Sequence, residues 1–113
     1  MKESNLLKLC QLEASKHGAV TLRNNIGAYK HTKGYFIHYG VGGAGGSDLI
    51  GWTRDGRFLA IETKIIGRNP TPEQVNFLAQ VNKAGGIGIL AYSVEDVTKA
   101  LCIEMKGNEN GRK

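Results

Sequence analysis

Two acidic residues and a lysine stand at a spacing that could assemble a metal-binding, hydrolytic site. Asp48 begins one apolar run, and Glu62 and Lys64 lie two residues apart in a second run, 58–66. Side chains alternate between the two faces of a strand, so Glu62 and Lys64 share a face that is otherwise apolar. A charge on a buried face is costly unless it is paired or bound to a metal. These residues are therefore the first candidates for chemistry.

A tight turn would bring the three residues together. Asp55-Gly56 separates the runs 47–52 and 58–66, and Asp-Gly is a strong signal for a turn between antiparallel strands. We therefore expect a hairpin that places Asp48 beside Glu62 and Lys64 at one end of a sheet.

The chemistry that suits such a set is metal-assisted hydrolysis. Mg²⁺ (or Mn²⁺) takes oxygen ligands, often one or two carboxylates, and keeps positions for water and phosphate. The metal lowers the pKa of bound water. A lysine beside it could position or deprotonate that water, or stabilise charge in the transition state. The same three residues could instead form a salt-bridged cluster at a strand end, and their spacing alone leaves both interpretations open.

The surrounding elements alternate helical and β patterns. Thr71, Pro72 and Gln74 form an N-cap, a first helical residue and a capping box. Further strands are expected at 19–23, 35–39 and 87–92, and helices at 3–17, 72–84 and from 94 onward. The order α-β-β-β-β-α-β-α predicts one α/β (α+β) domain, a mixed sheet flanked by helices, over residues 1–106. Residues 107–113 are polar and predicted to be a disordered tail.

Composition narrows the partners. The 113 residues fit one domain with a modest core. Fifteen Lys and Arg against ten Asp and Glu give a net charge of +5, which favours a polyanion. No membrane span or signal peptide is apparent, and Cys10 and Cys102 suit buried thiols in a reducing compartment, so we expect a soluble, cytoplasmic protein. Trp52 is expected to pack in the core.

A glycine-rich loop precedes Asp48. Five of the seven residues 40–46 are glycine, which suits sharp bends or a close approach of the backbone to a ligand. The loop lacks the Lys-Ser/Thr ending of a Walker-type nucleotide loop. A flexible connector explains the composition equally well.

The order of these motifs resembles a known family. Gly46-Ser47-Asp48, thirteen further residues, and then Glu62-Thr63-Lys64 resemble the PD-(D/E)XK nuclease signature. More narrowly, the chain is similar to the VRR-NUC (virus-type replication-repair nuclease) domain in its stand-alone form, from Glu3 through Thr71-Pro72-Glu73-Gln74, over roughly residues 3–97. Ser47 departs from the family's usual proline, which shapes backbone rather than performing chemistry.

The resemblance implies a restriction-endonuclease-like fold and a role for each matching residue. Asp48 and Glu62 would be metal ligands, with the backbone carbonyl of Thr63 as a third, and Lys64 would be catalytic. Glu3 would reach the metal directly or through water, with Glu13 as the alternative helix acid. Gln74 would line the site, although its capping-box role competes with that assignment.

The implied activity is divalent-metal-dependent endonuclease cleavage of DNA, selective for Holliday junctions or other branched structures, by a homodimer. The family's name suggests a viral or phage origin, hence the host cell cytoplasm. Tyr29 and Tyr35 could stack on bases. Basic residues near the site could contact phosphates: Arg23, Lys30, Lys33, Arg54, Arg57 and Arg68. The alternatives are a non-catalytic nucleic-acid-binding module of the same fold and a basic protein–protein adaptor.

Overall fold

A computed structural model describes residues 1–111, with side chains described as far as residue 103. Its elements are α1 (Glu3–Lys16), β1 (Val20–Arg23), β2 (Gly27–Lys30), β3 (Phe36–Tyr39), the 3₁₀ turn η1 (Gly43–Gly45), β4 (Leu49–Trp52), β5 (Phe58–Thr63), α2 (Pro72–Lys83), β6 (Ile87–Ala91) and α3 (Val94–Gly111). The predicted mixed α/β class is confirmed. The predicted order lacks one strand, β2, whose short sequence has no apolar alternation and which forms a ladder only with β3.

Four strands form the central sheet, in the order β1-β4-β5-β6. The strands β1, β4 and β5 pair antiparallel, whereas β6 runs parallel to β5 and is reached through α2. The sheet is therefore mixed, as predicted, and the β4–β5 hairpin around Asp55-Gly56 is confirmed. The end of β5 and the start of β4 lie at the same end of this sheet, here called the site end.

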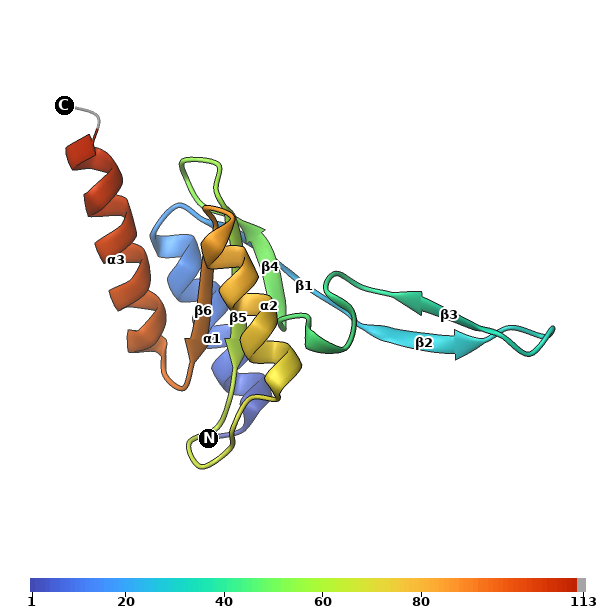
Figure 1. Cartoon of the computed structure of the whole chain (residues 1–113). Helices are drawn as coiled ribbons and strands as arrows, with labels where there is room; N and C mark the ends of the chain where they lie inside the picture. Colours follow the sequence, from blue (N-terminus) through green and yellow to red (C-terminus); the bar gives the residue numbers. More distant parts are fainter. Residues whose placement is uncertain (112–113) are drawn as a thin grey trace.

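Strand β5 is buried on both faces because helices cover both sides of the sheet (Figure 1). On one face, Leu59 and Ile61 join the main core with buried residues of α1 and α3. On the other, Ala60 packs against Leu78 and Val81 of α2. Glu62 continues the face of Ala60, so its side chain lies under α2.

The strands β2 and β3 form a separate two-stranded sheet that extends away from the rest of the molecule (Figure 1). This projection makes the structure elongated, with extents of 57 × 32 × 23 Å. Asn24 fastens its base to the glycine loop. The side-chain amide of Asn24 donates to the carbonyls of Val41 and Ser47 (2.8 and 3.0 Å), and its oxygen accepts from the Val41 amide (3.0 Å).

The end of α3 and one of the two cysteines differ from what the sequence predicted. The helical backbone of α3 extends to Gly111 and so includes residues 107–111 of the stretch expected to be a tail, whose disorder stays a prediction. Residues 112–113 lie outside the described part. Cys10 is buried as predicted, but Cys102 is exposed. No helix in residues 1–111 is long and apolar enough to span a membrane.

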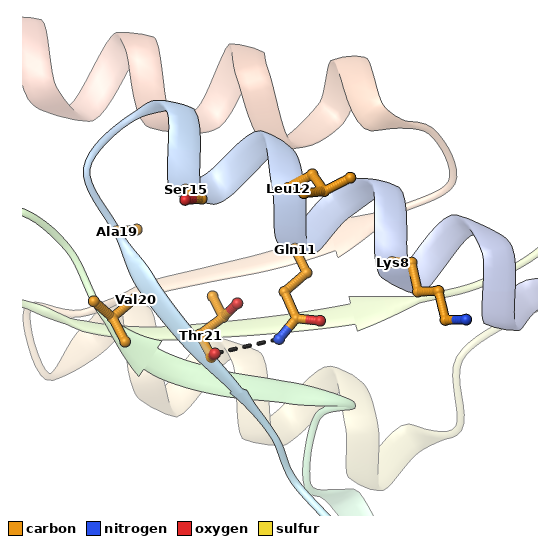
Figure 2. A pocket seen from close by; sticks show the side chains of 7 residues that line it. All are labelled: Lys8, Gln11, Leu12, Ser15, Ala19, Val20 and Thr21. Atoms are coloured by element: carbon orange, nitrogen blue, oxygen red, sulfur yellow. Dashed lines mark hydrogen bonds between the residues drawn. The ribbon is translucent and has the colours of Figure 1, made fainter.

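A groove between α1 and β1 is lined by residues that hold the edge strand in place (Figure 2). Gln11 donates its side-chain amide to the carbonyl of Thr21 at 3.3 Å. Lys8 is the only charged residue among those lining the groove, which contains no carboxylate. This groove is therefore not the site that Asp48 and Glu62 predict.

Candidate active site

Asp48 lies immediately before β4 and is held by the end of β5. Its Oδ2 accepts hydrogen bonds from the backbone amide and the hydroxyl of Thr63, at 2.9 and 2.8 Å. Its own backbone amide donates to Oε1 of Glu62 at 3.2 Å. The register that pairs Leu49 with Ile61 sets these contacts, because it places the residue before β4 opposite Glu62. The hairpin thus joins two carboxylates that are distant in sequence.

Glu62 is the most buried charged residue of the site, with 2% of its surface exposed. Its Oε2 lies 3.4 Å from Nζ of Lys64, whose side chain is 16% exposed. The same oxygen accepts a hydrogen bond from Nε2 of Gln74 at 3.1 Å. Strand β5 supplies Glu62, the residue directly after its end is Lys64, and the first turn of α2 supplies Gln74.

Gln74 serves two structures with one side chain. Its Oε1 accepts from the Thr71 backbone amide (2.9 Å), while its backbone amide donates to Thr71 Oγ1 (3.1 Å), completing the predicted capping box. Its Nε2 meanwhile reaches Glu62. The predicted capping box is therefore confirmed, and the contact with Glu62 places Gln74 beside the two carboxylates.

The electrostatics of the site centre on Glu62. Burial and, to a smaller extent, the neighbouring Asp48 charge raise the pKa of its carboxyl from 4.5 to about 7, while Lys64 opposes both effects. A cation bound between the two carboxylates would offset their mutual repulsion and the cost of burying the charge of Glu62. The carboxylates of Asp48 and Glu62 offer oxygen ligands, which Mg²⁺ and Mn²⁺ prefer, so these residues fit such an ion.

The glycine loop packs tightly against α2 instead of remaining a free connector. A β-carbon at Gly45 would lie about 2.4 Å from the backbone oxygen of Glu73, which no side chain could tolerate. Ser47, at the position of the family's proline, is buried and donates its hydroxyl to the carbonyl of Leu49 at 2.8 Å. The loop therefore fixes the chain just before Asp48.

Neither Glu3 nor Glu13, the two candidate acids of α1, forms a hydrogen bond with the site residues described above. α1 begins at the site end of the sheet (Figure 1), and Glu3 is half-buried in its first turn. Among the described residues, however, no three His, Cys, Asp or Glu side chains form a group that could hold a metal. Glu13 is engaged elsewhere, accepting hydrogen bonds from Thr98 (2.7 Å) and His17 (3.0 Å), which lower the pKa of its carboxyl. Glu13 therefore ties α1 to α3.

The basic residues expected near the site fall into three groups. Arg23 ends β1 beside Leu49, and Arg68 lies in the exposed loop after β5, both at the site end. Lys30 and Lys33 lie on the projecting hairpin. The expectation that Arg54 and Arg57 flank the site is wrong. Both lie in the β4–β5 turn, at the opposite end of the sheet, roughly 17 Å of strand away.

Arg57 has a structural role at that far end. Its Nε donates to the carbonyl of Gly85 at 2.8 Å and its Nη2 to that of Gly86 at 3.3 Å. These contacts join the β4–β5 turn to the turn before β6.

Two contributors to the site were not found in the sequence. Thr63 was considered only for its carbonyl, yet its amide and hydroxyl orient Asp48. Asn24 links the projecting hairpin to Ser47, and its backbone amide donates to the carbonyl of Asp48 at 2.8 Å. A polar residue directly after a strand is a common capping position, but nothing in the sequence indicates its partner.

Comparisons with known proteins agree with the fold. The family model described as the VRR-NUC domain matches residues 2–95, most of the chain. A solved structure described as a VRR_NUC domain is 18% identical and superposes with a TM-score of 0.59, covering 86% of this chain and 90% of that chain. No curated protein matches the chain. The structural likeness supports the fold, and the family match extends across Asp48, Glu62, Lys64 and Gln74.

Proposed function

The chain belongs to the VRR-NUC domain family, and from that premise we propose that it is a divalent-metal-dependent endonuclease that hydrolyses phosphodiester bonds in DNA. One observation carries the proposal: the fold brings Asp48, Glu62, Lys64 and Gln74 into one connected set at the site end of the sheet. A purely structural salt bridge would need only one carboxylate and the lysine.

The side chains divide the work. Thr63 orients Asp48 through two hydrogen bonds, and Gln74 holds one oxygen of Glu62. Asp48 and Glu62, with the Thr63 carbonyl, would hold Mg²⁺ or Mn²⁺, and Glu3 would contribute directly or through a water. When bound, such an ion acts as a Lewis acid and lowers the pKa of its bound water.

Lys64 is the remaining catalytic group. Its ammonium is largely sheltered from solvent and lies beside Glu62, so it could orient a water for attack or neutralise charge on a phosphoryl oxygen. Neutralising a developing charge in a sheltered site is more effective than in bulk water.

We further propose a branched DNA substrate, such as a Holliday junction, and a homodimer. The net charge of +5 suits a polyanion. A two-fold dimer would present two sites to two strands, and a second subunit would add burial to a small core. We also propose that it acts in the cytoplasm of a cell or infected host.

The test is a cleavage assay with Mg²⁺ or Mn²⁺ on four-way junctions, forks, flaps, single strands and duplexes. Lys64→Ala and Asp48→Ala should abolish cleavage, and Lys64→Ala should leave DNA binding intact. Lys83→Ala, which removes an exposed lysine from the last turn of α2, is the matched control and should cleave normally. Binding by wild type without cleavage of any substrate would refute the proposal and assign a non-catalytic binding module instead.

A further inference from the structure

We propose that the projecting hairpin, residues 27–39 and here called the arm, contacts nucleic acid by stacking its aromatic side chains on unpaired bases. This inference deepens the proposed nuclease function and rests on it for the choice of partner. It concerns a surface separate from the set formed by Asp48, Glu62, Lys64 and Gln74.

The arm carries an unusual concentration of exposed rings. Tyr29, Tyr35, Phe36 and Tyr39 are 55, 53, 60 and 49% exposed. In the described part of the chain the arm extends away from the helices, and its two strands pair only with each other (Figure 1). An isolated two-stranded hairpin is marginally stable in water, and exposed aromatic clusters on such an element indicate a binding surface.

The strand register collects most of these rings on one face. Tyr29 pairs with Ile37 and Gly27 with Tyr39, so their side chains share that face, and the Tyr39 ring lies over Gly27. The adjoining pair, His31 and Tyr35, is already stacked, with ring centroids 4.5 Å apart and planes 6° apart. The result is a ladder of flat surfaces along one side of the arm, which is the form of a base-stacking platform.

Charge identifies the partner as an anion. Between Glu13 and Asp48 the sequence has no Asp or Glu, whereas Arg23, Lys30 and Lys33 lie at the base and along the arm. Lys30 pairs with Phe36 on the face opposite the ladder, and positive charge beside exposed aromatic rings is a combination that binds single-stranded nucleic acid. A second copy of this chain fits less well, because its own arm would bring the same positive charge.

The arm is coupled to the active site at its base. Asn24 bonds to both Val41 and Ser47, and its backbone amide donates to the carbonyl of Asp48. From Asn24 the strands reach out about 30 Å, which corresponds to roughly nine nucleotides of one strand of B-form DNA. Bases bound on the arm would therefore lie within one helical turn of the scissile phosphate.

The test measures binding without cleavage. Fluorescence anisotropy with a labelled oligothymidine of about 20 nucleotides, in EDTA, would compare wild type with Tyr29→Ala, Tyr35→Ala and Tyr39→Ala. Each should bind roughly 5- to 150-fold more weakly, and less so for blunt duplex. Tyr29→Phe and Tyr35→Phe keep the rings and should bind as wild type. Trp52→Ala removes a ring that is 49% exposed at the far end of β4 and should also bind normally.

A direct measurement separates stacking from loss of the arm's fold. Photocrosslinking to an oligonucleotide carrying 5-bromouracil should attach DNA to a peptide spanning residues 29–39. Crosslinks confined to other peptides would overturn the inference, as would unchanged affinity in the alanine variants. If those variants change a dimer into a monomer in sedimentation but bind DNA normally, the arm is a subunit interface and the inference is wrong.

The two proposals fail separately. Arm-dependent binding by a protein that cleaves nothing would remove the nuclease function and leave the arm's role intact. Cleavage by arm variants with unchanged DNA affinity would do the reverse.

Discussion

Glu62→Gln should make the metal-free protein more stable at alkaline pH while abolishing its activity. Burial and the charge of Asp48 raise the pKa of Glu62 from 4.5 to about 7 in the folded state. Between those values the folded chain retains a proton that the unfolded chain releases. The free energy of unfolding therefore falls as pH rises through this window. The ionised carboxylate is thus a local destabilising group that the proposed function requires.

The magnitude follows from the shift. A change from 4.5 to about 7 corresponds to about 3 kcal/mol of stability lost between about pH 4.5 and pH 8. For a chain of this length that is a change of about 10 °C in Tm. Gln cannot ionise, so the variant lacks this contribution. Any constant effect of the amide, for example beside Lys64, shifts the whole curve without changing its slope.

Chemical denaturation in EDTA at several pH values would measure the effect. The difference in unfolding free energy between Glu62→Gln and wild type should move in the variant's favour by about 2–3 kcal/mol from about pH 5 to pH 8. Glu73→Gln, an exposed carboxyl on α2, is the matched control and should show no such trend. A difference that is flat with pH would refute the reasoning. Mn²⁺ at about pH 8 should stabilise wild type and not Glu62→Gln.

Three further predictions test other contacts. Gln74→Ala should lower the free energy of unfolding by about 1 kcal/mol and should slow cleavage. Gln74→Glu should restore the capping box, and hence the stability, but not the cleavage. Thermal unfolding and cleavage rates measure the two effects. Asn24→Ala should lose about 1–2 kcal/mol and slow cleavage, because it unties the loop before the site; Asn25→Ala, its exposed neighbour, should do neither. Arg57→Ala should reduce stability by about 1 kcal/mol and leave DNA affinity unchanged, whereas Arg68→Ala should weaken DNA binding at constant stability; the reverse pattern would contradict the placement of these two arginines.

Local signals predicted the part of the fold that carries the site. Asp55-Gly56 predicts a hairpin, and the two-residue alternation of an extended chain places Glu62 and Lys64 on one face. Those two facts suffice to bring Asp48 to Glu62. The capping box likewise locates the start of α2 within a residue. These features depend on residues that are close together in the sequence, so they can be predicted from the sequence alone.

What the sequence did not predict depends on long-range packing. Trp52 was expected in the core but is 49% exposed, because it ends a strand beyond the cover of the helices. The strand β2 has no apolar alternation and is defined by its partner β3. Arg54 and Arg57 are near the site in sequence, yet the turn they occupy carries them to the far end of the sheet. In a hairpin the first residue lies beside the last, whereas the turn lies a full strand length away from both.

The four convergent side chains all fall within residues 48–74, and this compactness along the chain makes the catalytic part modular. Closing a segment of this length costs about 1 kcal/mol less in chain entropy than closing one of about 100 residues. The arm enters and leaves the fold upstream of that segment, at Asn24 and the glycine loop. Its tip can therefore gain or lose residues without changing any distance among Asp48, Glu62, Lys64 and Gln74. Evolution can therefore change which nucleic acid the arm binds while the catalytic residues keep their geometry.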